Sequence, residues 1–138
     1  MRVREEAIWW LETAKRDIKR AERSLEHGDR AAATFWAEQA AEKALKALHI
    51  AFKGTIPKIH SIKRLFEELG TNLGLDEEVL EAAYELTQYY YLSHYPDIVE
   101  GVPDEVISSA TAERAVRVAK RIVEAAERAL EEAFSSSS

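Results

Sequence analysis

RAAATFWAEQAAEKALKALHIAFK, residues 30–53, contains neither proline nor glycine, and alanine recurs in it at steps of three or four positions. This spacing places the small side chains on one face of an α-helix. A face built from alanine lets neighbouring helices approach closely, with Trp36 as its bulky anchor. Gly28-Asp29 before the segment and Gly54 after it are typical helix boundaries. The segment is therefore predicted to be a core helix.

The same apolar spacing predicts further helices on both sides of this core helix, and no segment alternates in the manner of a β-strand. These helices are expected at about residues 3–27, 61–69, 76–91 and 104–134. Because all but the one at 61–69 are long, we predict an all-α fold. It is an antiparallel up-down bundle of four main helices plus one short helix.

Length and composition fit one ordinary globular domain. The chain has 138 residues, of which 46% are hydrophobic and 32% charged. Residues 1–134 are expected to form the bundle, and the serine run 135–138 a disordered tail. No apolar run is long enough to cross a bilayer, and the N-terminus does not resemble a secretory signal, so we expect a cytoplasmic protein without membrane contact.

Several chemistries are excluded by residue usage. The absence of cysteine removes thiolate nucleophiles, disulfides and cysteine-ligated metal sites. The four histidines lie far apart, so we expect no metal site and no cofactor. A net charge of −6 disfavours a general polyanion binder but leaves room for a local basic groove. Abundant glutamate and few side-chain amides favour a thermophilic source.

Three motifs occur in a fixed order along the chain. Residues 39–48 read QAAEKALKAL, His60-Ser61 precedes Leu65 and Leu69, and residues 89–97 read YYYLSHYPD. Together they resemble the prokaryotic HEPN domain family over about residues 5–133. The resemblance implies a homodimer, often paired with a small nucleotidyltransferase in toxin–antitoxin-like modules. Active members of that family are metal-independent endoribonucleases, whereas other branches have been proposed to bind nucleotides.

The chain departs from the family's nuclease signature, which is an arginine, four to six intervening residues and a histidine. No arginine occurs between Leu65 and Glu113, and His94 occupies the position where related chains have an arginine before Tyr-Pro. Arg20 and His27 match the spacing formally, with six residues between them, but they belong to the first helix. The sequence therefore leaves open whether this chain is an enzyme.

His94 is the candidate catalytic residue, because histidine titrates near neutral pH and can act as general acid or base at an RNA 2′-hydroxyl. It is expected in a loop with three tyrosines and an aspartate that would contact unpaired bases, Tyr90, Tyr91, Tyr95 and Asp97. The alternative, which the sequence favours, places Tyr90 in the core and His94 in a hydrogen bond or at a dimer surface.

A second candidate site surrounds the start of the short helix. Lys58, His60, Ser61 and Lys63 could bind a phosphate together with free backbone N–H groups. The alternative is that His60 packs between helices and the lysines are solvated. The arginines of the first and last helices are expected to be solvated and paired within their own helix, for example Glu113 with Arg117.

Trp9 points away from the apolar face of the first helix, which favours an interface with another chain. The hypothesis that follows is a non-catalytic homodimer in a toxin–antitoxin-like module, binding a nucleotidyltransferase-like partner and a nucleotide or RNA. The alternative is a metal-independent endoribonuclease toxin that uses His94 and borrows a cation from Lys58, Lys63 or the other protomer.

Overall fold

The computed structural model describes residues 2–69, 77–94 and 101–136, and these contain helices but no strand. The helices are α1 (Arg2–Glu26), α2 (Arg30–Lys53), α3 (Ile62–Leu69), α4 (Glu77–His94), α6 (Pro103–Val106) and α7 (Ser109–Ser136). The predicted all-α fold is confirmed.

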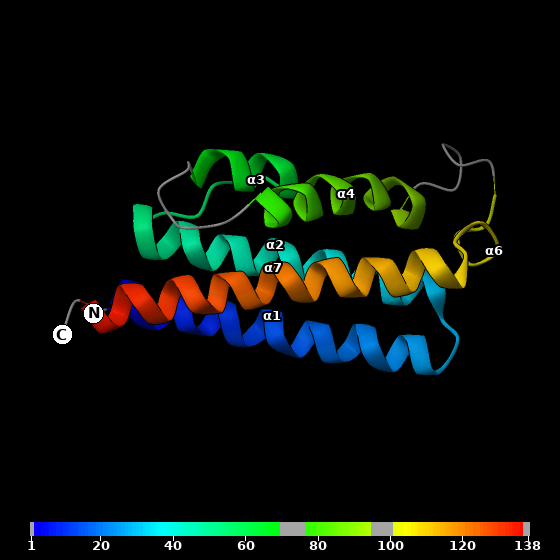
Figure 1. The fold of residues 1–138 in the computed structure, drawn as a ribbon, viewed down its shortest axis with the longest axis horizontal. Coiled ribbons are helices and arrows are strands. Elements are labelled where there is room, and N and C mark those ends of the chain that lie inside the picture. The colour runs from blue at the N-terminus through cyan, green and yellow to red at the C-terminus, as the bar shows by residue number, and fades with distance from the viewer. Residues whose placement is uncertain (1, 70–76, 95–100, 137–138) are drawn as a thin grey trace.

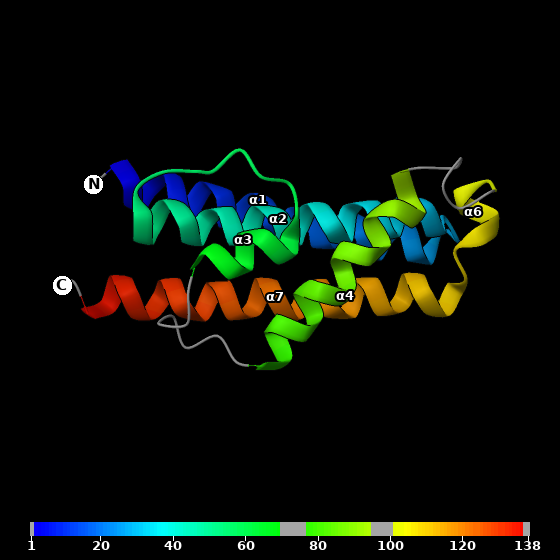
Figure 2. The same cartoon turned by 90° about the horizontal axis from the view of Figure 1, so that it is seen from above.

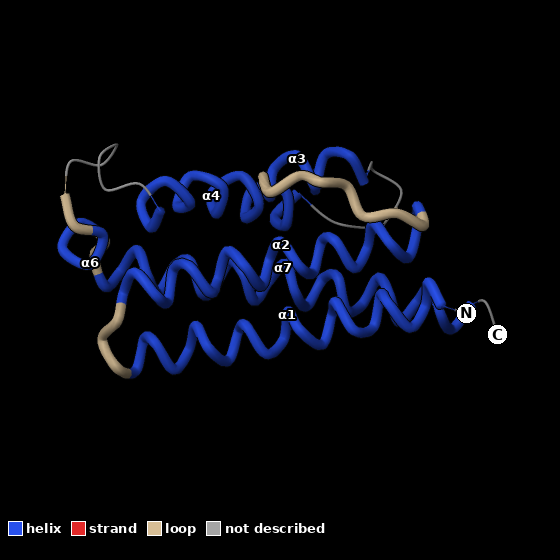
Figure 3. The backbone as a smooth tube through the Cα atoms, turned by 180° about the vertical axis from the view of Figure 1, so that it is seen from behind, coloured by secondary structure: helices blue, strands red, loops and turns tan. Residues whose placement is uncertain are grey.

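The helices form three layers (Figure 1): α1 on one side, α2 and α7 in the middle, and α3 with α4 on the other side. Successive long helices run in opposite directions, as predicted for an up-down bundle. Seen from above, α4 crosses obliquely over α2 and α7 (Figure 2). From behind, the connection between α2 and α3 runs back along the bundle (Figure 3).

α2 begins and ends where its flanking residues predict. The Asp29 side chain accepts a hydrogen bond from the Ala32 amide at 3.1 Å, which satisfies one of the free N–H groups of the first turn. Gly54 ends the helix in the left-handed conformation (φ 75°), and its N–H donates to the Ile50 carbonyl. Glycine adopts this conformation without the steric cost that a Cβ would add.

The core is organised around α2, which contacts every other described helix. Six of its alanines have no exposed surface: Ala33, Ala37, Ala40, Ala41, Ala44 and Ala47. The larger apolar side chains that fill the core come mostly from the surrounding helices, and include Leu65, Leu86 and Ile122. Trp36, the expected anchor, is only partly buried; its ring packs edge-on against Phe35.

α3 is fastened to its neighbours by polar contacts to its backbone. The buried His49 of α2 hydrogen-bonds through Nε2 to the Leu65 carbonyl at 2.8 Å. On the opposite side, the Lys63 amide donates to Thr87 Oγ1 of α4 at 2.9 Å. The short helix is therefore held between α2 and α4 even though eight residues alone would not form a stable helix.

Three predicted boundaries differ from the structure. The segment after residue 92 was expected to be a loop, but α4 continues to His94; a helix usually ends at or before the residue that precedes a proline, here Pro96. The expected helix 104–134 is interrupted, because Ile107 is extended and buried in the core while Ser108 Oγ accepts from the Thr111 amide and caps α7. α7 also continues to Ser136, two residues into the expected tail.

Three cations of α7 pair with glutamates of other helices. Arg114 contacts Glu85 of α4 at 3.0 Å, and Arg121 contacts Glu78 of α4. Lys120 reaches Glu22 of α1 at 3.2 Å. The arginines were expected to pair within their own helix; this was wrong for Arg114 and Arg121, because α4 crosses close enough to offer its glutamates.

The buried His49 is expected to make the stability of the protein depend on pH. Burial lowers the pKa of His49, the hydrogen bond to Leu65 opposes this shift, and the charge of Lys53 adds to it. Below about pH 6.5, His49 therefore binds a proton more readily in the unfolded chain than in the folded chain. We expect the free energy of unfolding to fall as the pH drops from 7 to 5, by at most about 1.4 kcal/mol per pH unit from this group.

The measurement is urea unfolding at pH 7, 6 and 5 on the wild type, on His49→Gln and on the exposed control His27→Gln. Glutamine can still donate to the Leu65 carbonyl but does not titrate. The loss of stability on acidification should be smaller in His49→Gln than in the other two proteins. Equal losses in all three would show that His49 does not carry this dependence.

Candidate functional site

The end of α4 carries the residues that the sequence singled out for catalysis. Tyr90, Tyr91 and His94 belong to the last two turns of this helix, while Tyr95 and Asp97 lie outside the described residues. His94 is thus the terminal residue of a helix and not part of the loop in which it was expected.

Tyr89, about one turn before this end, forms a hydrogen bond within α4. Its hydroxyl donates to Glu85 Oε1 at 3.0 Å, and the same carboxylate accepts from Arg114 of α7. Burial, followed by the hydrogen bond to Glu85, raises the pKa of Tyr89 to about 12. The phenol therefore stays protonated at physiological pH, and the group of Tyr89, Glu85 and Arg114 fastens α4 to α7.

At the second predicted site, the start of α3, most of the polar groups already contact other groups of the protein. Ser61 Oγ accepts from the Arg64 amide at 3.3 Å, and Lys63 Nζ lies 5.2 Å from the centre of the Tyr84 ring. Since the Lys63 amide is also bonded to Thr87, a phosphate would find few free backbone donors here. Lys58 is exposed on the preceding connection.

His60 is joined to a polar cluster that the sequence did not single out. Its Nδ1 lies 3.3 Å from Glu42 Oε2, which also accepts from Lys46 at 3.0 Å. Lys46 in turn lies 5.8 Å from the centre of the Trp10 ring. Glu42 and Lys46 are almost fully buried side chains of α2, whereas the imidazole of His60 is 73% exposed. The four-residue spacing of Glu42 and Lys46 was the only signal for this pair in the sequence.

A buried carboxylate lies between α1 and α2. Asp17 has no exposed surface, and its two oxygens accept from Arg20 and Lys43, each at 2.6 Å. The Arg20 guanidinium also lies 5.2 Å from the Trp36 ring centre. An ionised group is tolerated at such depth only when it is paired and hydrogen-bonded. Asp17 was missed in the sequence because its partner Lys43 is 26 positions away.

The formal match to the nuclease spacing is not an assembled pair. Arg20 is held by Asp17, while His27 Nδ1 lies 2.8 Å from the Arg23 carbonyl at the exposed end of α1. Nothing in these contacts joins the guanidinium to the imidazole.

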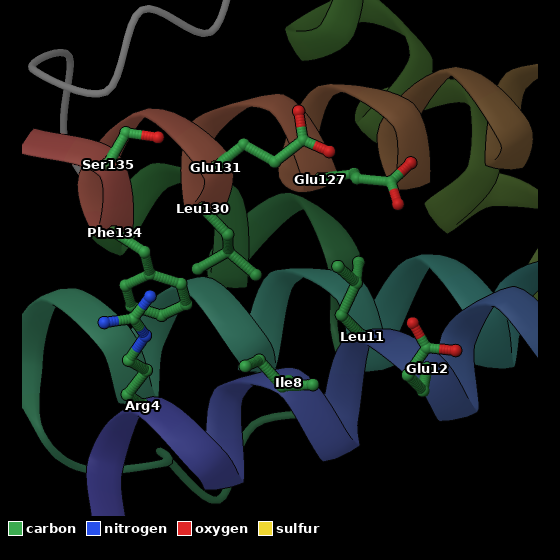
Figure 4. A pocket seen from close by; sticks show the side chains of 9 residues that line it. All are labelled: Arg4, Ile8, Leu11, Glu12, Glu127, Leu130, Glu131, Phe134 and Ser135. Carbon is green, nitrogen blue, oxygen red and sulfur yellow. The ribbon is translucent and has the colours of Figure 1, made fainter. Parts of the chain in front are cut away.

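Trp9 is the most exposed large apolar residue of the described chain, with 56% of its surface accessible. Ile8 beside it lines an open pocket between the first turns of α1 and the last turns of α7 (Figure 4). Leu11, Leu130 and Phe134 form its apolar wall, and the Arg4 guanidinium lies 4.8 Å from the Phe134 ring centre.

Two classes of site are not seen in the described part of the chain. No group of three or more histidines, aspartates or glutamates is arranged to hold a metal ion there. None of the described helices is both long enough and apolar enough to cross a bilayer.

The family model and the similar solved structures point to the same protein family. A family model described as HEPN domain matches residues 7–129. The crystal structure of TT1696 from Thermus thermophilus is 38% identical, with a TM-score of 0.83 over 90% of this chain and 98% of that chain. ST0689, described as an archaeal HEPN homologue, is 31% identical, with a TM-score of 0.74 over 91% of this chain and 98% of that chain.

The HEPN domain protein TM0613 from Thermotoga maritima is 32% identical, with a TM-score of 0.69 over 88% of this chain and 97% of that chain. No curated protein sequence matches the chain. The three solved structures share the fold over nearly their whole length.

Proposed function

This chain belongs to the HEPN domain family, and from that premise we propose that it is a non-catalytic, homodimeric binding protein. It acts in the cytoplasm in a toxin–antitoxin-like module, where it engages a nucleotidyltransferase-like partner and holds a nucleotide or RNA without cleaving it. The alternative within the same family is a metal-independent endoribonuclease toxin that uses His94.

The charge environment of α4 is the observation that carries the proposal. Cleavage at a 2′-hydroxyl places negative charge on the phosphorane, which a preorganised cation must stabilise when no metal does so. Residues 65–113 contain neither arginine nor lysine, so α4 brings no such cation to His94. Arg114 and Arg121, which reach α4 from α7, are each paired with a glutamate of that helix.

The polar residues of the QAAEKALKAL segment support the same conclusion. Lys43 holds the buried Asp17, and Lys46 pairs with Glu42. Side chains that already form ion pairs inside the bundle are poor hydrogen-bond donors and acceptors for a substrate. This first of the three family motifs therefore stabilises the bundle and leaves binding to other surfaces.

The apolar surface at the start of α1 supports a homodimer. The neighbouring residues Ile8 and Trp9 are exposed in the first turns of α1, and Ile8 lines the open pocket toward α7. Large aromatic anchors of this kind carry much of the binding energy at protein interfaces. We place the second copy of the chain against this surface, with Trp9 as the central contact.

The proposal predicts that RNA survives in the presence of excess protein. Labelled single-stranded RNA is incubated in EDTA with the wild type, His94→Ala and Arg20→Ala, and its length is followed on a denaturing gel. We expect intact RNA with all three proteins, because α4 itself contains no cation and the arginines Arg114 and Arg121 that pair with it are held by its glutamates.

Cleavage by the wild type that disappears only in His94→Ala would contradict the proposal and establish the endoribonuclease. Loss of cleavage only in Arg20→Ala would instead assign activity to the pair on α1. Equal cleavage by all three would identify a contaminating nuclease.

The homodimer predicts a specific change in mass. In size-exclusion chromatography with light scattering, the wild type should elute at about twice the 15.6 kDa chain mass. Trp9→Ser should weaken the dimer at least about 30-fold, the equivalent of a hot-spot loss of about 2 kcal/mol. The control Val106→Ser removes an exposed apolar residue at the opposite end of the bundle and should remain dimeric. A Trp9→Ser protein that dimerises like the wild type would exclude this surface.

A further inference from the structure

The outer face of α1 carries an unusual concentration of positive charge. A groove along this helix is lined by one acidic residue and five basic residues, Glu12, Lys15, Arg16, Lys19, Arg20 and Arg23. At 100° per residue these positions lie opposite the buried side of the helix, which contains Ala14 and Ile18. The groove is strongly basic although the whole chain has a net charge of −6.

Three of these cations are available to a ligand. Lys15 pairs with Glu127 at 2.7 Å, and Arg20 is held by Asp17. Arg16, Lys19 and Arg23 remain, and within the described residues their side chains take part in no ion pair or hydrogen bond. The buried Asp17 is already neutralised by two cations, so it does not offset them.

The exposed charged residues of α7 differ from those of the groove in their balance of signs. On α7 they are four arginines and four glutamates: Glu113, Arg114, Arg117, Arg121, Glu124, Arg128, Glu131 and Glu132. Two of these arginines pair with glutamates of α4, and the others face solvent. The groove on α1 lacks this balance of signs, since only one of its six residues is acidic.

We propose that this groove binds the phosphate backbone of single-stranded RNA. The proposal deepens the proposed function and rests on its RNA-binding part. From Arg16 to Arg23 the helix rises about 10 Å at 1.5 Å per residue. The three free cations are spread over this length in one row along the helix, so they can meet neighbouring phosphates of one extended strand.

RNA fits this groove better than an acidic protein does. The exposed large apolar residues of the described chain are Val3, Ile8, Trp9, Phe52, Val102 and Val106, and none of them lies in the groove. Protein interfaces depend on a desolvated apolar or aromatic centre. Binding to a phosphate backbone is electrostatic and independent of sequence, so it requires only the cations.

The test compares two matched double variants of the full-length protein. Arg16→Ala with Arg23→Ala removes two unpaired arginines from α1, and Arg117→Ala with Arg128→Ala removes two from α7. Binding of a fluorescent twelve-nucleotide oligouridylate is measured in EDTA between 50 and 200 mM salt. Alanine favours the helix, so both variants should fold, and far-ultraviolet circular dichroism checks this.

We expect the α1 variant to bind roughly 10- to 30-fold more weakly at about 0.1 M salt. The slope of log K against log salt should become shallower by about 1.4, since each lost phosphate contact contributes about 0.7. The α7 variant should retain the wild-type affinity. Equal weakening of both variants, or no binding by the wild type, would overturn the proposal.

A polyglutamate peptide serves as the second probe. If the α1 variant lost peptide binding but kept RNA binding, the groove would belong to an acidic protein and the proposal would be wrong. The oligonucleotide's length is checked in the same samples, so that cleavage, which would contradict the non-catalytic function, is read separately from the affinity.

Discussion

Close packing against the alanine face of α2 is the constraint on which the rest of the structure depends. Side chains such as Ala37 and Ala44 have no exposed surface, and α2 contacts every other described helix. Replacing a buried alanine by a larger residue would force the surrounding helices apart, at a typical cost of about 1–3 kcal/mol in proteins, or about one tenth to one half of a domain's net stability. The positions of α1, α4 and α7, and of every charge that they carry, follow from this helix.

Polar residues of α2 then hold α1, α3 and the connection between α2 and α3 in place. Lys43 reaches the buried Asp17 of α1, and His49 holds the Leu65 carbonyl of α3. Glu42 connects Lys46 with His60 on the connection that follows α2. The QAAEKALKAL motif, residues 39–48, is therefore explained by packing and by polar contacts around α2. The row of unpaired cations Arg16, Lys19 and Arg23 lies elsewhere, on the outer layer formed by α1.

The sequence predicted those features that depend on neighbouring residues. Asp29 and Gly54 bound α2 as expected, since a cap acts over three or four positions. Contacts between distant segments could not be predicted in this way. Arg114 and Glu85 are 29 positions apart, so their pairing depends on how α4 crosses α7. The interruption at Ile107 depends on a core position that exists only in the folded bundle.

The candidate site was predicted less completely than the fold, for the same reason. The arginines of α1 were visible in the sequence, but only the folded chain shows that Asp17 is withdrawn into the interior and leaves Arg16 and Arg23 unpaired. The most direct test of this account is a map of backbone amide chemical shifts during titration with single-stranded RNA in EDTA. The account predicts shifts along residues 12–23 of α1 and RNA of unchanged length at the end. Shifts centred on His94, accompanied by shortened RNA, would contradict it.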